Sequence, residues 1–195
     1  MQSEIALIAG LGNPGSKYAK TRHNVGFWFL EALQNRFGFS LVNEKKFFGI
    51  VGQFVHEGRQ IRVVAPTTFM NLSGQSVGAM ATFYRIPPEQ ILVAHDELDL
   101  EPGTVRLKSG GGHGGHNGLR DIIPRVGSPK FTRLRIGIGH PGHARAVSGY
   151  VLSNPSTDDR ILIDQKIDQA IQWLPEILSG DTQKAMNALH TKAER

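Results

Sequence analysis

Short apolar or alternating runs, bounded by glycine, proline and polar residues, recur along the chain and indicate buried strands. Two of them are expected to form a hairpin around a turn at Glu57-Gly58. The expected strands cover residues 5–9, 47–56, 60–65, 91–94, 104–108 and 134–138, with a short extended piece at 150–152.

Apolar residues at helical spacing indicate helices between these strands. The first helix begins at Asn24 and is expected to end at Gly38, because glycine readily forms a left-handed helix terminus. Serine and asparagine are expected to cap later helices, and a further helix is expected after Gly180. The expected caps are Ser73, Asn117 and Ser156.

The order of these elements predicts the fold class. Strands that alternate with helices are typical of α/β proteins, and the hairpin adds antiparallel pairs. We therefore expect one α/β domain over residues 1–195, with a twisted mixed sheet surrounded by helices.

A glycine-rich stretch, residues 110–118, contains six glycines in nine residues. Glycine at this density is unfavourable in a packed helix or strand, so we expect a loop. A flexible linker is one interpretation, but linkers favour serine, and this stretch lies between an expected strand and an expected helix. Its glycines would let a ligand approach the backbone, and the N–H groups of the following helix suit a carbonyl oxygen or a phosphate.

The composition narrows the class of protein. Over 195 residues, 39% are hydrophobic and 20% are charged, which are ordinary values for a globular domain. Zero cysteines exclude disulfides, cysteine nucleophiles and cysteine zinc sites. The apolar runs are too short to span a bilayer, and no basic region precedes an apolar one at the N-terminus. We therefore expect a soluble cytoplasmic protein.

The net charge of +5 is unevenly distributed. Between residues 106 and 135 the only acidic residue is Asp121, whereas a solvated helix face would mix both signs. A segment whose charges are nearly all positive, around a glycine loop, favours a polyanionic partner, and nucleic acid is the commonest polyanion. Its basic residues are Arg106, Lys108, Arg120, Arg125, Lys130, Arg133 and Arg135.

Polar residues gather in four loops that follow expected strands, where α/β proteins bind their ligands. A neutral amide can donate to one oxygen and accept from one N–H, so asparagine suits a peptide group. A histidine backed by a carboxylate can take a proton from water near neutral pH. These features indicate chemistry on a neutral carbonyl. The residues are Asn13, His23, Asn71, Asp96, His116 and Asn117.

Five motifs together resemble bacterial peptidyl-tRNA hydrolase, in the family's order and over essentially the whole chain. They are Gly10 to Gly15, Thr21-Arg22-His23-Asn24-Val25-Gly26, Pro66 to Gly74, His95-Asp96-Glu97-Leu98-Asp99 and Gly110 to Gly118. The resemblance implies a monomeric enzyme that cleaves the ester between a peptide, or an N-blocked aminoacyl group, and the 3′-terminal ribose of tRNA. Free tRNA would be recycled from stalled or aborted translation. The implied partner is peptidyl-tRNA, bound through its acceptor stem, 5′-phosphate and peptide, with no metal and no cofactor.

The resemblance also implies roles for individual residues. His23 would be the general base that activates water, with Asp96 bonded to its other ring nitrogen. Asn13 would help to distinguish an N-blocked aminoacyl group from a free one. Lys108 and Arg135 would hold the 5′-phosphate. The other substrate-binding residues would be Tyr18, Phe69, Asn71, His116 and Asn117, with Met70 supporting the pocket.

Two alternatives involve a cofactor or a metal. Gly10 to Gly15 matches the G-x-G-x-x-G dinucleotide fingerprint, but residues 16–23 are polar and basic where that motif needs a helix at once. His113 and His116 are three residues apart and could contribute to a metal site, but the chain has no cysteine and no H-E-x-x-H helix.

Two further alternatives remain. Gly74 to Gly78 matches G-x-S-x-G, and Ser76, Asp96 and His116 follow the α/β-hydrolase order, which would make a covalent serine esterase. That motif needs a sharp turn after a strand, and no apolar strand leads into Gly74. A non-catalytic RNA-binding module would also account for the basic segment, whereas the histidine, aspartate and asparagine set favours the enzyme.

Overall fold

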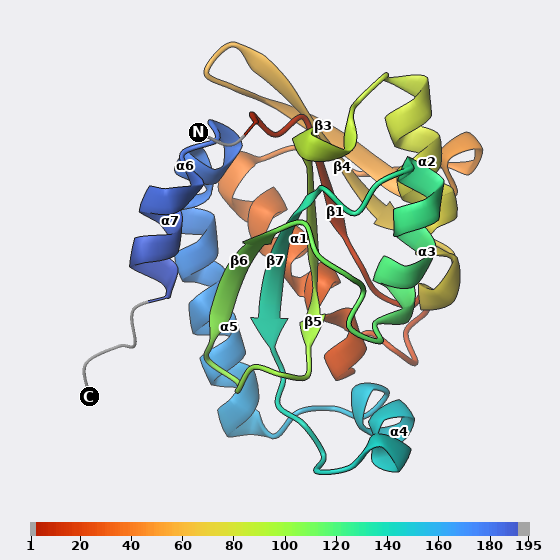
Figure 1. The fold of residues 1–195 in the computed structure, drawn as a ribbon, viewed down its shortest axis with the longest axis vertical. Coiled ribbons are helices and arrows are strands. Elements are labelled where there is room, and N and C mark those ends of the chain that lie inside the picture. Colours follow the sequence, from red (N-terminus) through yellow and green to blue (C-terminus); the bar gives the residue numbers. More distant parts are fainter. Residues whose placement is uncertain (1–2, 191–195) are drawn as a thin grey trace.

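The computed structural model describes residues 3–190, and the strands among them form one mixed sheet (Figure 1). The order of its seven described strands is β2-β3-β4-β1-β5-β7-β6. β1 is parallel to β4 and β5, and β5 is parallel to β7, whereas the other neighbouring pairs are antiparallel. The strands are β1 Leu7–Gly10, β2 Val42–Glu44, β3 Gly49–His56, β4 Arg59–Pro66, β5 Ile91–Glu97, β6 Val105–Ser109 and β7 Thr132–Gly137.

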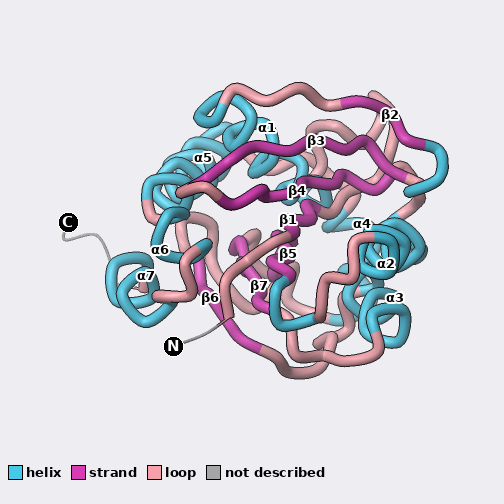
Figure 2. Tube along the Cα trace, turned by 90° about the horizontal axis from the view of Figure 1, so that it is seen from above, coloured by secondary structure: helices cyan, strands magenta, loops and turns pink. Residues whose placement is uncertain are grey.

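Helices cover both faces of this sheet. In Figure 2, α1, α5, α6 and α7 lie on one side of the strands, and α2 and α3 lie on the other. The helices are α1 Val25–Phe37, α2 Ser73–Phe83, α3 Asn117–Val126, α4 Val147–Val151, α5 Thr157–Gln172, α6 Leu174–Leu178 and α7 Thr182–Leu189. Three of the short 3-10 helices also matter for the site: η1 Arg22–Asn24, η3 Met70–Leu72 and η5 Ala144–Ala146.

Each face of the sheet buries its own apolar core, because neighbouring side chains of a strand point to opposite faces. Within β1, Ile8 packs into the core with α1 and α5, whereas Leu7 and Ala9 pack into the core with α2 and α3. All three side chains have no exposed surface. Strands covered on both sides require continuous apolar runs, which is why β1 and the start of β5 were recognisable in the sequence.

The predicted α/β class with a mixed twisted sheet surrounded by helices is confirmed. The hairpin of β3 and β4 turns at Glu57-Gly58, where both residues have positive φ, 49° and 75°, as a tight two-residue turn requires. The predicted helix after Gly180 corresponds to α7. The prediction of one domain over residues 1–195 includes residues 1–2 and 191–195, which lie outside the described residues, and stays a prediction.

Several predicted elements were wrong in detail. Residues 150–152 were expected to be extended, but Tyr150 and Val151 belong to α4, whose Val147 and Val151 are one helical turn apart. A run this short has no readable period, so its apolar residues fit a strand or a helix equally. β5 continues to Glu97 and therefore contains Asp96, which was placed in the loop after residue 94. β2 was missed, because Val42–Glu44 is too short and too exposed to give a pattern.

Two of the predicted helix caps were also wrong. Ser73 is the first residue of α2, and its hydroxyl donates to the carbonyl of Met70 at 2.6 Å. Asn117 is the first residue of α3, and the cap is His116, whose side chain accepts from the backbone of Gly118 and Leu119. Ser156 does cap α5, accepting from the Asp159 N–H at 3.1 Å. Both errors arose because a cap-type residue stood next to the true boundary.

The carboxyl ends of the parallel strands open on the side of the molecule where α4 lies, at the bottom of Figure 1. No helix within residues 3–190 is long and apolar enough to cross a membrane.

Candidate active site

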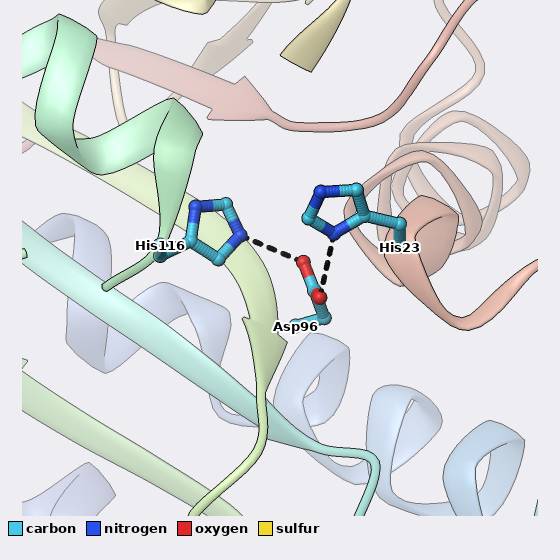
Figure 3. Close-up of side chains that lie close together, drawn as sticks. All are labelled: His23, Asp96 and His116. Carbon is cyan, nitrogen blue, oxygen red and sulfur yellow. Dashed lines mark hydrogen bonds and ion pairs between the residues drawn. The ribbon is translucent and has the colours of Figure 1, made fainter. Parts of the chain in front are cut away.

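The centre of the site is the carboxylate of Asp96, which lies between two imidazole rings (Figure 3). Its Oδ2 is 2.7 Å from Nδ1 of His23, and its Oδ1 is 2.7 Å from Nε2 of His116. The three side chains come from β5, η1 and the start of α3. The structure thus brings together residues separated by 73 and 20 positions in the sequence.

The tautomer of the neutral His116 ring follows from its backbone contacts. Its Nδ1 accepts hydrogen bonds from the N–H groups of Gly118 and Leu119, at 3.1 and 3.3 Å. Because a ring nitrogen that accepts carries no hydrogen, the hydrogen of the neutral ring lies on Nε2 and is donated to Asp96. His116 therefore anchors the start of α3 to the carboxylate. The first turn of α3 leaves little room for a side chain at Gly118. A Cβ there would lie 2.8 Å from the sulfur of Met70 and 3.1 Å from Cε1 of His116.

The second histidine, His23, has the geometry of a general base. Burial lowers the pKa of His23, but the charge of Asp96 and its hydrogen bond outweigh burial and raise that pKa above its usual value. Burial alone would raise the pKa of Asp96, but the two histidines hold it well below its usual range. The carboxylate is therefore ionised and accepts the Nδ1 hydrogen of His23. The remaining nitrogen, Nε2, points away from Asp96 (Figure 3) and can accept a proton.

The loop of Asn13 is fixed against η1 by a side chain that the sequence did not single out. Asn24 accepts from the backbone N–H of Asn13 at 2.9 Å and donates to its carbonyl at 3.0 Å. The side-chain oxygen of Asn13 accepts from the backbone N–H of Met70 at 2.7 Å. Within residues 3–190 the side-chain NH₂ of Asn13 makes no hydrogen bond, so this group is available to a ligand.

A cavity of about 360 Å³ adjoins the three central side chains. His23, Asp96, His116 and Asn117 line it on one side, and η5 and α4 line it on the other. The remaining candidates lie outside its lining. Tyr18 and Phe69 form an edge-to-face pair with ring centroids 6.2 Å apart, and Phe69 is 56% exposed. Asn71 is exposed in η3, next to the buried Met70.

A second cavity, of about 270 Å³, lies beside the first and shares Glu97, Asp99 and Gly114 with it. Lys108 and Arg135 both line it, as does the buried Arg133. Arg135 donates twice to Oε1 of Glu97, at 2.9 and 2.5 Å. Lys108 forms no ion pair with any described residue.

The basic segment does not form one uniform surface. Arg133 is 2% exposed, and its guanidinium donates to the carbonyls of Gly111, Gly112 and Pro129, so it holds the glycine loop in place. Others bind protein groups: Arg106 the carbonyl of His190, Arg120 the side chain of Asn117, and Arg125 the side chain of Asp121. Sequence reasoning could not single out Arg133, because its burial depends on the register of β7 in the sheet.

His95, the neighbour of Asp96, faces the second cavity. Its Nδ1 donates to the backbone carbonyl of Asp96 at 2.8 Å. Burial lowers the pKa of His95 to about 3, with further lowering from His116 and Arg133. His95 is therefore neutral, and no local pattern in the sequence distinguished it from a second catalytic histidine.

The alternatives from the sequence can be compared with this geometry. Ser76 has no exposed surface, and its hydroxyl is buried without a partner among the described residues, so it cannot attack a substrate. The glycines of the first loop serve packing: a Cβ on Gly10 would lie 2.4 Å from the carbonyl oxygen of Gly26, and one on Gly12 would lie 2.6 Å from the Phe27 ring.

A metal site built on His113 and His116 is not the arrangement that the structure contains. The described residues that could jointly reach an ion are His23, Asp96 and His116, whose ligand atoms lie within 4.8 Å of one another. The tautomer of His116 disfavours an ion there. An ion on its Nε2 would displace the hydrogen while Nδ1 still accepts two N–H groups, which leaves an imidazolate.

Comparisons with known proteins place the chain. The family model for peptidyl-tRNA hydrolase matches residues 7–195. A peptidyl-tRNA hydrolase of Pseudomonas paraeruginosa is 57% identical over 189 residues, covering 96% of this chain and 97% of that protein. One of Haemophilus influenzae is 56% identical over 190 residues, covering 97% and 98%. The crystal structure of peptidyl-tRNA hydrolase from Acinetobacter baumannii has a TM-score of 0.94 at 53% identity, covering 98% of this chain and 97% of that one.

The fold is that of a hydrolase of the α/β class. Within that class, the chain belongs to the peptidyl-tRNA hydrolase family.

Proposed function

We propose that this chain hydrolyses the ester between the peptide and the 3′-terminal ribose of tRNA, with His23 as the general base. The observation that carries the proposal is the pair formed by His23 and the ionised Asp96, beside a cavity large enough for an aminoacyl group. Asp96 holds the hydrogen on Nδ1, so Nε2 is the nitrogen that accepts a proton.

The reaction begins with a water molecule bonded to Nε2 of His23. As the water oxygen attacks the ester carbonyl carbon, its proton moves to Nε2, and the imidazolium is stabilised by Asp96. The tetrahedral intermediate then collapses, the bond to the ribose oxygen breaks, and His23 returns the proton to that oxygen. The products are a peptide acid and a tRNA with a free hydroxyl.

The amide groups of three asparagines act on the peptide part of the substrate. Asn13 offers an NH₂ group whose direction is fixed by Met70 and Asn24, so it donates to a carbonyl oxygen of the N-blocked aminoacyl group. Asn71 and Asn117 are both exposed, Asn117 in the lining of the cavity, and they bind the backbone of the peptide. The exposed edge of the Tyr18 and Phe69 pair contacts its side chains.

The two adjoining cavities suit the end of an acceptor stem, where the 5′-phosphate and the 3′-terminal ribose belong to neighbouring strands. The ester would occupy the cavity of His23, and the 5′-phosphate would bind Lys108 and Arg135 in the other. One chain supplies every residue in this scheme, so we propose that the protein acts as a monomer, in the cytoplasm where translation releases its substrate.

A discharge assay on an N-acetyl-aminoacyl-tRNA tests the proposal. We expect release of the N-acetyl amino acid at a rate that a metal chelator leaves unchanged. Binding without turnover would reduce the protein to an RNA-binding module, and loss of turnover with chelator would assign the chemistry to a metal.

A further inference from the structure

One wall of the His23 cavity belongs to a segment that stands apart from the sheet. This segment, which we call the α4 wall, runs from Ala144 to Val151, and it lines the cavity with Ala144, Val147, Ser148 and Val151. Figure 1 shows α4 beyond the carboxyl ends of the strands, at the bottom of the view. The shape of the cavity therefore depends on whatever attaches this wall to the body.

Arg22, the residue before His23, makes that attachment. Its guanidinium lies over the Tyr150 ring, with Cζ 3.9 Å from the ring centroid. The same group donates to the carbonyls of Tyr150 and Ser153, at 3.2 and 3.3 Å, and to the hydroxyl of Ser153 at 2.6 Å. The backbone N–H of Arg22 also donates to the Ser153 carbonyl at 3.0 Å.

These contacts suit a cation at the carboxyl end of a helix. The carbonyls of Tyr150 and Ser153 lie at the end of α4, where backbone carbonyls carry partial negative charge, and the Tyr150 carbonyl also accepts from the N–H and the hydroxyl of Ser153, at 3.1 and 2.7 Å. A planar guanidinium can stack on an aromatic ring and donate in its own plane at the same time, which an ammonium cannot do. Arg22 therefore uses features of arginine that lysine lacks.

Tyr150 extends the attachment to the sheet. Its hydroxyl donates to the carbonyl of Ile138, just after β7, at 2.6 Å. The hydroxyl also fills the space beside Gly139, where a Cβ would lie 3.0 Å from it. The ring thus lies between the end of β7 and the guanidinium of Arg22, and the α4 wall is fixed between η1 and β7.

We propose that Arg22 is a positioning residue that sets the distance between the α4 wall and His23, and thereby the fit of the aminoacyl part of the substrate. The proposal rests on the proposed function for the identity of that substrate. Because the wall touches the substrate before and during the reaction, it contributes to binding in both states, and its displacement raises KM more than it lowers kcat.

The test compares Arg22→Ala with a matched variant, Arg160→Ala. Arg160 also stacks on an aromatic ring, with Cζ 3.5 Å from the Trp28 centroid, and bonds a carboxylate of its own helix, but it lies outside the His23 cavity. On N-acetyl-aminoacyl-tRNA we expect Arg22→Ala to raise KM about 10-fold and to change kcat by less than about 3-fold, on the scale of a few lost hydrogen bonds. Arg160→Ala should change neither constant.

Hydrogen exchange gives a readout that does not depend on turnover. In Arg22→Ala the amides of residues 147–153 should exchange faster than in the unmodified protein, with the strands unchanged. Arg22→Lys should bring KM only part of the way back to the value of the unmodified protein. Lysine keeps the positive charge, but it cannot stack a planar guanidinium on Tyr150 while donating in the plane of that group. If Arg22→Ala does not fold, Ser153→Ala, at an exposed position, removes one acceptor and should shift KM in the same direction by less.

The outcomes separate the two proposals. No turnover in the unmodified protein contradicts the proposed function. Three results would overturn the role of Arg22. They are an unchanged KM in Arg22→Ala with normal turnover, an equal change of KM in Arg160→Ala, and full recovery of KM in Arg22→Lys.

Discussion

The side-chain oxygen of Asn13 accepts a hydrogen bond from the backbone N–H of Met70 at 2.7 Å, and this bond fixes the orientation of the amide. The buried side chain, 6% exposed, is left with its NH₂ group for a ligand. Asn13 can therefore recognise an oxygen of the substrate. A free α-amine, which is largely cationic, offers this group nothing to bind.

The first prediction uses this orientation. Asn13→Asp keeps the oxygen that bonds Met70 but replaces the donor NH₂ with a second oxygen, whereas Asn13→Ala removes both. Both variants should lower kcat/KM on N-acetyl-aminoacyl-tRNA by about 10-fold or more, and the slow rate on free aminoacyl-tRNA should change much less. The measurement is the ratio of the two specificity constants.

Asn43→Asp, on the exposed strand β2, is the control for added charge. An unchanged ratio in both Asn13 variants would reduce Asn13 to a turn residue.

The second prediction concerns the base. His23→Ala should lower kcat by about 10²–10⁴-fold, the usual contribution of a positioned proton acceptor, and leave tRNA affinity nearly unchanged. Ser76→Ala should keep its activity and its melting temperature, because it removes a buried hydroxyl that has no partner within residues 3–190. A folded but inactive Ser76→Ala, or a trapped acyl-enzyme, would contradict attack by water.

The third prediction concerns the second cavity. Lys108→Ala should lower kcat/KM far more on substrates that carry a 5′-phosphate than on a short ester without one. Adding Arg135→Ala should lower kcat/KM on the phosphorylated substrates further. The plot of log kcat/KM against log salt concentration should flatten by roughly 0.7–0.9 for each phosphate contact removed. Lys108 should contribute more than Arg135, which already pairs with Glu97.

Lys184→Ala, on the exposed face of α7, is the matched control and should leave this slope unchanged. Equal losses on both substrates would mean that Lys108 and Arg135 support the fold or the chemistry.

The fourth prediction concerns stability and pH. The pKa of His95 falls from 6.5 to about 3 on folding, so between these values the unfolded chain binds a proton that the folded chain does not. The stability from the neutral ring is complete above pH 6.5 and is lost as pH falls, by up to about 1.4 kcal/mol per pH unit. In His95→Asn the free energy of unfolding should therefore fall less between pH 7.5 and pH 5.

Denaturant unfolding at the two pH values measures this difference. His143→Asn, at an exposed histidine, should keep the original pH dependence. The same loss of stability in His95→Asn as in the unmodified protein would show that His95 does not titrate in this way.

The sequence predicted the fold class well because its signals are local. Apolar runs such as Ile5 to Ala9 and the Glu57-Gly58 turn depend on neighbouring residues alone. The boundaries were less predictable, since Ser73 and Asn117 are cap-type residues one position inside their helices. Residues 150–152 were misassigned because α4 has only five residues, too few to show a helical period.

The candidate site was predictable only in part. The positions of Asn13, His23 and Asp96 near the ends of strands followed from the strand pattern, although Asp96 lies inside β5. The hydrogen bond between His23 and Asp96 was implied by the resemblance, since 73 residues separate the two. Nothing local shows that His116 bonds the same carboxylate, because that depends on which nitrogen caps α3. The burial of Arg133 was likewise set by register and not by composition.

The double use of His116 has a consequence for redesign of the glycine loop. One nitrogen holds the first turn of α3 and the other holds Asp96, so the start of this helix and the carboxylate form one mechanical unit. Gly114 and Gly115 line the cavity of His23 and have positive φ, 57° and 84°, so a side chain at either position would strain the backbone. A residue inserted after His116 would rotate the helix by about 100° relative to its cap. Grafting this loop onto another scaffold would therefore require transferring the helix start together with it.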